Sequence, residues 1–255
     1  MKTTAIYFSP TGTSKRGCVA IAGALQAGAE EIDVTIGKEA HKREFTKEDV
    51  VVFGAPVYGG RVFKGLKERL KEIKGQKTPC VITVTYGNRD YDDALLELAD
   101  IAIAQGFLPI AGAALIGEHT FGRIQVGRPN EKDITEDIAF AQKILAKLQA
   151  KNITSLQLPG NRPYVHGEEG MRHVGFIPST DENCTNCGLC AQECPEGAID
   201  RGDYSKIDEI KCISCFRCIR ICPVHAKKMD TEAYKNFAED FTKKLENPRE
   251  NQFFL

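Results

Sequence analysis

The chain of 255 residues is 42% hydrophobic and 27% charged, and its formal net charge is -1. This balance excludes a protein that binds nucleic acid through a strongly basic surface, and it also excludes a chain that is disordered throughout. The first residues lack a basic region followed by an apolar core, and the longest uncharged stretch, Ile101–Gly117, is short for a membrane span. We therefore expect a cytoplasmic protein with neither nucleic acid nor a membrane as its partner.

The amino-terminal part alternates between apolar runs and periodic segments, which predict strands and helices. The predicted strands are Thr4–Phe8, Ile32–Ile36, Val50–Ala55, Cys80–Thr85 and Leu108–Ile116. The predicted helices are Ser14–Gln26, Lys64–Lys74, Asp92–Gln105 and Glu131–Gln149. This alternation predicts a doubly wound α/β fold with a five-stranded parallel sheet that is covered on both faces. Such folds bind ligands beyond the carboxyl ends of their strands.

The loop after the first predicted strand is rich in hydroxyl groups and runs into a helix. Its sequence is Ser9-Pro10-Thr11-Gly12-Thr13-Ser14. Hydroxyls and backbone amides at a helix start can bind a phosphate without a cation, and glycine lets the backbone approach closely. A nucleotide-binding P-loop is excluded, because Cys18 and Val19 follow the second glycine where lysine and a hydroxyl residue are needed. An ordinary helix cap is the alternative interpretation.

Two later loops place tyrosines beside glycines at the same edge of the predicted sheet. One follows the third strand with Pro56, Val57, Tyr58 and Gly59. The other follows the fourth strand with Thr85, Tyr86, Gly87, Asn88 and Tyr91. Flat rings can sandwich a planar cofactor, whereas a single such tyrosine often serves only for packing. The coincidence of three loops at one edge favours a cofactor site.

With these three loops, residues 1–150 resemble a flavodoxin. Ser9 replaces the usual first threonine of the phosphate loop, and Thr13-Ser14 replaces the usual Asn-Thr, but the hydroxyls are retained. The resemblance implies FMN as the cofactor. Its phosphate would be held by Ser9, Thr11, Gly12, Thr13 and Ser14. Its ring would be bordered by Pro56, Val57, Tyr58, Gly59, Thr85, Tyr86, Gly87, Asn88 and Tyr91.

Residues 151–178 are predicted to link this domain to a second one. The segment is rich in glycine and proline, and it carries Arg162, Tyr164, His166, Arg172 and His173. These side chains are expected either to fold back over the flavin or to lie on an exposed polar linker. His119, after the fifth strand, is interpreted either as a flavin contact or as a loop histidine.

Eight of the ten cysteines fall into two copies of one motif, C-x2-C-x2-C-x3-C followed by proline, which lie 28 residues apart. Thiols stay reduced in the cytoplasm, which favours metal chemistry over disulfides. One tight loop with three thiolates fits three corners of a cubane 4Fe-4S cluster, and the fourth thiolate must come from elsewhere. Structural zinc fits this spacing poorly. The lone Cys18 and Cys80 are expected to be buried.

In runs of this kind the fourth cysteine ligates the other cluster. The first cluster is therefore predicted to use Cys184, Cys187, Cys190 and Cys222. The second is predicted to use Cys212, Cys215, Cys218 and Cys194. Residues 179–230 resemble the bacterial-type ferredoxin with two 4Fe-4S clusters, which implies a small α+β domain.

Residues 231–255 are predicted to form a helical tail. Tyr234, Phe237, Phe241 and Leu245 recur at helical spacing, and we expect this stripe to pack on the protein. Phe253 and Phe254 are expected either to pack likewise or to mark a partner surface.

The whole chain resembles the flavodoxin–ferredoxin fusion proteins of anaerobes. The resemblance implies an electron-transfer protein that passes electrons between FMN and two 4Fe-4S clusters, coupling one- and two-electron steps for a partner oxidoreductase. No catalytic residue is assigned, because the cofactors perform the chemistry. Redox proteins are the expected partners, and a homodimer stays open. Two alternatives also stay open: an FMN-dependent reductase of a small substrate fed by the clusters, and a redox sensor or binding module with structural clusters.

Overall fold

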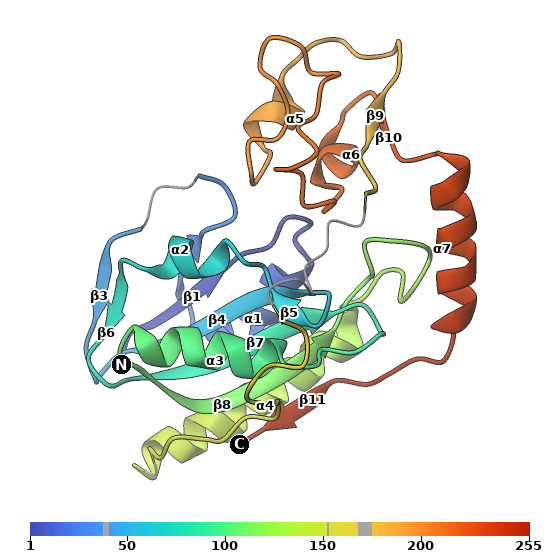
Figure 1. Ribbon diagram of the computed structural model, residues 1–255. Helices are drawn as coiled ribbons and strands as arrows, with labels where there is room; N and C mark the ends of the chain where they lie inside the picture. Colours follow the sequence, from blue (N-terminus) through green and yellow to red (C-terminus); the bar gives the residue numbers. More distant parts are fainter. Residues whose placement is uncertain (38–40, 152, 168–174) are drawn as a thin grey trace.

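The computed structural model describes residues 1–37, 41–151, 153–167 and 175–255. Figure 1 shows an α/β domain formed by the amino-terminal part, a smaller unit of short elements above it, and helix α7 alongside both. The main sheet consists of β1 (Thr3–Tyr7), β2 (Glu30–Asp33), β4 (Val50–Tyr58), β5 (Arg61–Val62), β7 (Thr78–Tyr86), β8 (Phe107–Ile116) and β11 (Gln252–Phe254). A separate parallel pair consists of β3 (Arg43–Phe45) and β6 (Ile73–Gly75).

The helices of the α/β domain are α1 (Thr13–Leu25), α2 (Leu66–Leu70), α3 (Ala94–Ala104) and α4 (Glu131–Gln149). The smaller unit contains β9 (Ser179–Thr180), α5 (Leu189–Gln192), α6 (Arg217–Ile221) and β10 (Lys227–Lys228), and α7 (Glu232–Lys244) follows it. Within the described ranges, none of the helices is both long and apolar enough to cross a bilayer.

The strand order of the main sheet is β11-β8-β7-β4-β1-β2, with β5 paired to β4. Strands β2, β1, β4, β7 and β8 are parallel neighbours, as predicted. Numbered among themselves, these strands have the order 2-1-3-4-5 of the flavodoxin-like doubly wound fold. Strands β5 and β11 are antiparallel additions that the five-stranded prediction lacked.

Both faces of the sheet are buried at its centre because successive side chains along β1, β4, β7 and β8 are mostly apolar on both sides. Ile6 and Phe53 lie in a core with Leu98 of α3, whereas Ala5 and Val52 lie in a core on the opposite face, which includes side chains of α1 and α4. Such near-continuous apolar strands are typical of parallel sheets covered by helices on both faces.

The lone cysteines are fully buried, as predicted, with Cys80 in the core that includes α3 and Cys18 in the core on the other face. Burial raises the pKa of both thiols, which keeps them protonated at neutral pH.

Two predicted elements differ from the structure. The strand predicted over Ile32–Ile36 ends at Asp33, because the Asp33 carboxylate accepts a hydrogen bond from the Thr35 amide at 2.8 Å and turns the chain. The helix predicted over Lys64–Lys74 is limited to α2, and Ile73 begins a strand instead. Helical spacing of apolar residues continued to Ile73, but pairing of β6 with β3 overrides it.

The smaller unit has the predicted α+β character. Strands β9 and β10 pair antiparallel, and an isolated bridge joins Ile199 to Ile207. The helices α5 and α6 are each a single short turn that follows the second cysteine of one motif copy.

The carboxy-terminal tail is only partly helical, which corrects the prediction for residues 231–255. Helix α7 carries the predicted aromatic stripe, and this stripe packs on the protein. The last residues instead form β11, which pairs with β8 and covers an otherwise open sheet edge. Phe253 packs on Phe140 of α4 with ring centroids 4.8 Å apart.

The described part of the linker folds back on the α/β domain at helix α3. The amides of Asn161 and Val165 donate to the Asp93 carboxylate at 2.7 and 2.6 Å, and the Tyr164 hydroxyl donates to Asp100 at 2.7 Å. The backbone carbonyl of His166 accepts from Arg61. Arg162 pairs with Asp100 at 2.5 Å, whereas Arg172 and His173 lie outside the described residues.

Candidate functional site

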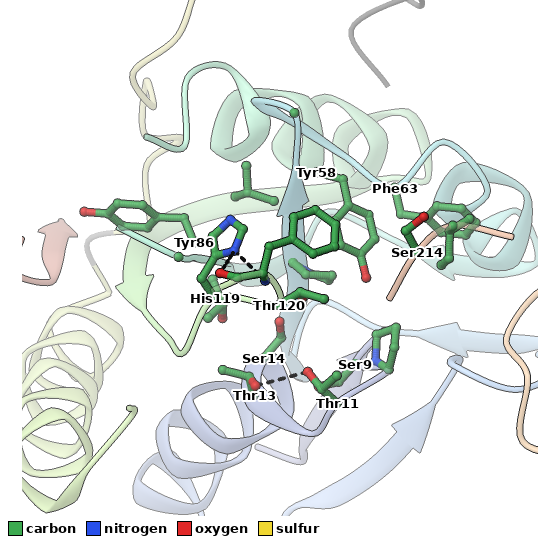
Figure 2. Close-up of a pocket in the computed structure, with 18 of the residues that line it drawn as sticks. Ser9, Thr11, Thr13, Ser14, Tyr58, Phe63, Tyr86, His119, Thr120 and Ser214 are labelled. Atoms are coloured by element: carbon green, nitrogen blue, oxygen red, sulfur yellow. Dashed lines mark hydrogen bonds between the residues drawn. The ribbon is translucent and has the colours of Figure 1, made fainter. Parts of the chain in front are cut away.

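A cavity of about 550 Å³ lies at the carboxyl ends of the parallel strands. Small-molecule sites commonly have this size. Figure 2 shows hydroxyl side chains of the β1–α1 loop at one end of the cavity, with Tyr58, Tyr86 and His119 opposite them. The residues predicted for the flavin site that line it are Ser9, Thr11, Thr13, Ser14, Pro56, Val57, Tyr58, Gly59, Thr85, Tyr86 and Gly87.

The hydroxyl end of the cavity coincides with the start of α1. Gly12 is the N-cap residue with φ of 80°, a conformation that glycine adopts without strain. Gly12 has no side chain that could cap the helix, and the first turn of α1 has no acidic residue. One amide of this turn is satisfied, because Ser9 Oγ accepts a hydrogen bond from the Lys15 amide at 3.0 Å. The Thr11 and Thr13 hydroxyls lie 3.2 Å apart. This arrangement suits an anion such as a phosphate.

The two tyrosines of the cavity differ in their freedom to contact a ligand. Tyr86 is buried, its hydroxyl donates to the Glu250 carbonyl at 3.4 Å, and its ring lies edge-on to Tyr91. Tyr58 is half-buried at the end of β4 and lies edge-on to Phe63 with centroids 6.4 Å apart. Burial raises the pKa of Tyr86 to about 12 and that of Tyr58 well above its usual value, so both hydroxyls are neutral.

Three residues predicted for the flavin site do not line the cavity. Gly12 shapes the loop instead, and Asn88 and Tyr91 hold the carboxy-terminal tail. Asn88 Nδ2 donates to the carbonyls of Leu245 and Asn247 at 2.8 and 2.9 Å. The Tyr91 hydroxyl donates to Gln252 at 2.8 Å. The tail occupies this side of the loop, and no local sequence pattern shows that contact.

His119 lines the cavity and is half-buried. Its Nδ1 accepts a hydrogen bond from the Phe121 amide at 2.8 Å, and burial lowers its pKa to about 4. The imidazole is therefore neutral at neutral pH. A Cβ atom at Gly87 would lie 2.2 Å from His119 Cδ2, so this close approach requires glycine at position 87.

One wall of the cavity comes from the smaller unit and was not predicted. It consists of Ile210, Lys211, Cys212, Ile213 and Ser214. The contact joins segments that are far apart in the sequence, so no spacing or periodicity could reveal it.

Three arginines fix the smaller unit against the α/β domain. Arg217 donates to the carbonyl of Pro10 at 2.7 Å, beside the hydroxyl loop. Arg220 pairs with Glu118 at 2.9 Å, and Arg69 pairs with Glu196 at 2.7 Å. Each contact reaches from one unit to the other, so the shared wall is held by several independent bonds.

An aromatic cluster extends this interface beside the cavity. Phe121, after β8, lies edge-on to Phe216 of the smaller unit with centroids 5.2 Å apart. Phe216 also contacts Tyr234 of α7 at 5.6 Å, and Phe176 contacts Phe237 at 4.9 Å. The predicted stripe of α7 therefore packs on both the α/β domain and the smaller unit.

The clustered cysteines form two groups. The charge of Cys194 contributes to the raised pKa values of Cys212, Cys215 and Cys218, so these four cysteines lie near one another, and the crossed assignment of ligands stays a prediction. Cys190 interacts in the same way with Cys184 and Cys187. The place of Cys222 in this first group stays a prediction. Within the described residues, no three His, Cys, Asp or Glu side chains converge to hold a single metal ion.

The two fourth cysteines have matching hydrogen bonds. The Ala198 amide donates to Cys194 Sγ at 3.3 Å, and the Ala226 amide donates to Cys222 Sγ at 3.2 Å. Hydrogen bonds to sulfur stabilise the thiolate form that a cluster requires. This donor set fits iron–sulfur ligation at both positions.

Comparison with known proteins supports two 4Fe-4S clusters in this region. The family described as a 4Fe-4S dicluster domain matches residues 177–223. Ferredoxin-2 of Chlorobaculum tepidum is 44% identical over 52 residues, which are 18% of this chain and 82% of that protein. The RNA polymerase subunit Rpo3 of Methanosarcina mazei is 42% identical over 65 residues, which are 24% of either protein, so the chain spans about a quarter of that subunit.

A solved flavodoxin from the domain Archaea covers 58% of this chain and 99% of its own, at 15% identity and a TM-score of 0.41. The flavodoxin-like assignment itself rests on the strand order. All eight motif cysteines lie inside the matched dicluster region. The chain belongs to the dicluster 4Fe-4S ferredoxin family, and it carries a domain of flavodoxin-like fold ahead of the ferredoxin domain.

Proposed function

We propose that this protein binds FMN in the cavity and passes electrons between the flavin and two 4Fe-4S clusters for a partner oxidoreductase. The observation that carries the proposal is the shared wall: Cys212, a predicted ligand of the second cluster, lines the same cavity as Thr11 and Tyr58. FMN exchanges two electrons and each cluster exchanges one, so one electron from each cluster and two protons from water balance the reduction of one flavin.

The lining of the cavity supports FMN as the ligand. The hydroxyls of Thr11, Thr13 and Ser14 gather at the start of α1, where the helix dipole favours the phosphate. Tyr58 and Gly59 line the other end, where a ring system needs flat apolar contact. A polar end and an aromatic end within one cavity match the two ends of FMN.

The burial of the cysteines supports an order of electron transfer. Cys215 is 8% exposed, and Cys212 of the same group lines the cavity, so the second group lies beside the cavity wall. Cys187 of the first group is exposed. We infer that the first cluster exchanges electrons with the redox partner and that the second exchanges them with the flavin.

Stopped-flow reduction of the anaerobic, fully loaded chain tests the proposal. About eight irons and one FMN per chain are expected after reconstitution. A one-electron reductant should reduce the clusters first, and flavin reduction should follow at a first-order rate that does not depend on protein concentration. A rate proportional to protein concentration would show that electrons pass between chains. Reduced clusters that never reduce the flavin would favour a sensor with structural clusters.

A further inference from the structure

Lys227 is a buried lysine inside the ferredoxin domain. The residue belongs to strand β10 and is 2% exposed. The ammonium donates to the Thr180 hydroxyl at 2.7 Å and to the Tyr204 carbonyl. Both acceptors are neutral, so neither of them balances the charge.

Among the residues that the structure describes, no carboxylate forms an ion pair with Lys227. The adjacent Lys228, by contrast, pairs with Asp181 at the surface. Removing an ammonium from water is costly unless an opposite charge compensates it. The part of the chain that the structure describes therefore supplies no carboxylate as a counter-charge for Lys227.

Lys227 lies close to the cysteine motifs, because the amide of the preceding Ala226 donates to Cys222 Sγ at 3.2 Å. It interacts electrostatically with Cys190 of the first group and with Cys212 and Cys218 of the second. A cubane cluster with four cysteine thiolates carries a charge of about -2 when oxidised, and reduction adds one more negative charge. Two such clusters would bring negative charge close to the ammonium.

The internal repeat shows that Lys227 departs from its counterpart. The offset of 28 residues pairs Lys227 with Ile199, which is also buried. An apolar side chain therefore suffices for packing at this position in one half of the domain. The other half buries a charge there, which points to an electrostatic role.

We propose that the Lys227 ammonium is the shared counter-charge of the two iron–sulfur clusters and raises their reduction potentials. A nearby positive charge favours the reduced cluster because reduction adds negative charge. Lys227 thus acts on the clusters through its charge and does not ligate iron. The inference depends on the dicluster assignment and not on flavin binding, so failure of intramolecular electron transfer would leave it intact.

Redox titration of the full, cluster-loaded chain, followed by EPR, tests this role. Replacement of Lys227 by methionine should lower the equilibrium constant for reduction of at least one cluster about tenfold, a shift of about 59 mV to more negative potential. Lys227→Arg should stay near the potential of the unmodified chain. Lys228→Met, which removes the same charge from an exposed side chain, should shift the potential much less.

Equal shifts in Lys227→Met and Lys228→Met, or no shift in Lys227→Met, would overturn the proposal. If Lys227→Met does not retain iron, Lys227→Gln is titrated in its place, because glutamine keeps a hydrogen-bond donor without the charge. Loss of iron in both neutral variants, with retention in Lys227→Arg, supports the proposal. Loss of iron in Lys227→Met, Lys227→Gln and Lys227→Arg would contradict the proposal, because the positive charge of arginine would then not suffice to keep the clusters bound.

Discussion

The guanidinium of the buried Arg69 donates to the partly buried carboxylate of Glu196 at 2.7 Å, and this ion pair joins the flavodoxin-like domain to the ferredoxin domain. The same guanidinium donates to the carbonyl of Pro195 at 2.6 Å, and Pro195 directly follows Cys194. Its other amino group donates to the carbonyls of Val34, Thr35 and Gly37. Arg69 therefore connects the loop after β2 with the backbone beside a predicted cluster ligand.

We expect Arg69→Met to lower the free energy of unfolding by about 3–5 kcal/mol, because it removes the shared donor of four backbone carbonyls and the charge that pairs with Glu196. Denaturant unfolding followed by circular dichroism measures this loss. Glu196→Gln is the matched control, since it keeps an acceptor for Arg69 and should cost less. A loss below about 1 kcal/mol in Arg69→Met would show that the pair does not hold the domains together.

Asn88 is expected to stabilise the tail and not to bind flavin. Besides donating to two tail carbonyls, its Oδ1 accepts from the Arg249 amide at 2.7 Å. Asn88→Ala should lower the free energy of unfolding by about 2–3 kcal/mol, because several buried partners lose their bonds. FMN titration should show little change in affinity. Tyr58→Leu should instead weaken FMN binding and leave the free energy of unfolding nearly unchanged. Weaker FMN binding in Asn88→Ala, with unchanged stability, would show that Asn88 contacts the flavin.

The difference between Asn88 and the cysteines shows what a sequence can predict. The apolar runs and the cysteine spacing are local patterns, and they predicted the parallel sheet and the dicluster region. The tail contacts of Asn88 and the cavity wall at Cys212 depend on segments that meet only in the folded chain. Strand β11 is similar, because nothing in Gln252–Phe254 reveals that the edge of β8 needs a partner.

The crossed ligand assignment predicts separate effects of the two fourth cysteines. Cys194→Ala should remove the cluster of Cys212, Cys215 and Cys218, because these thiols lie within electrostatic reach of Cys194. Iron analysis should fall from about eight to about four per chain, and EPR should lose one of two signals. Cys222→Ala should lose the other signal. Cys80 is a buried cysteine outside the motifs, so the control variant Cys80→Ala should keep all the iron. Loss of the same EPR signal in Cys194→Ala and Cys222→Ala would contradict the assignment.

The hydroxyl loop is expected to recognise the phosphate and not the ring. Thr11→Val removes one hydroxyl with little change in shape, so the dissociation constant of FMN should rise about tenfold. Quenching of flavin fluorescence measures this change. Riboflavin lacks the phosphate and serves as the control ligand, and its affinity should be unaffected. An equal loss for both ligands would place Thr11 beside the ring system instead.

Asp137 of α4 is expected to make the stability of the protein depend on pH. Its Oδ1 is buried and has no hydrogen-bond partner among the described residues. Burial, followed by the charges of Asp133 and Glu136, raises its pKa to about 7. In the unfolded chain the pKa of an aspartate is about 3.9.

Because its folded pKa is the higher one, Asp137 favours folding most below pH 4, and this contribution is lost as the pH rises towards 7. Asp137→Asn removes the penalty of ionising a buried carboxyl. The free energy of unfolding of this variant, relative to the unmodified chain, should therefore increase by about 2–3 kcal/mol between pH 5 and pH 8. Glu131→Gln, which removes an exposed charge from the same helix, should show no such increase. A difference that stays constant over this range would mean that the Asp137 carboxyl already ionises below pH 5 in the folded protein.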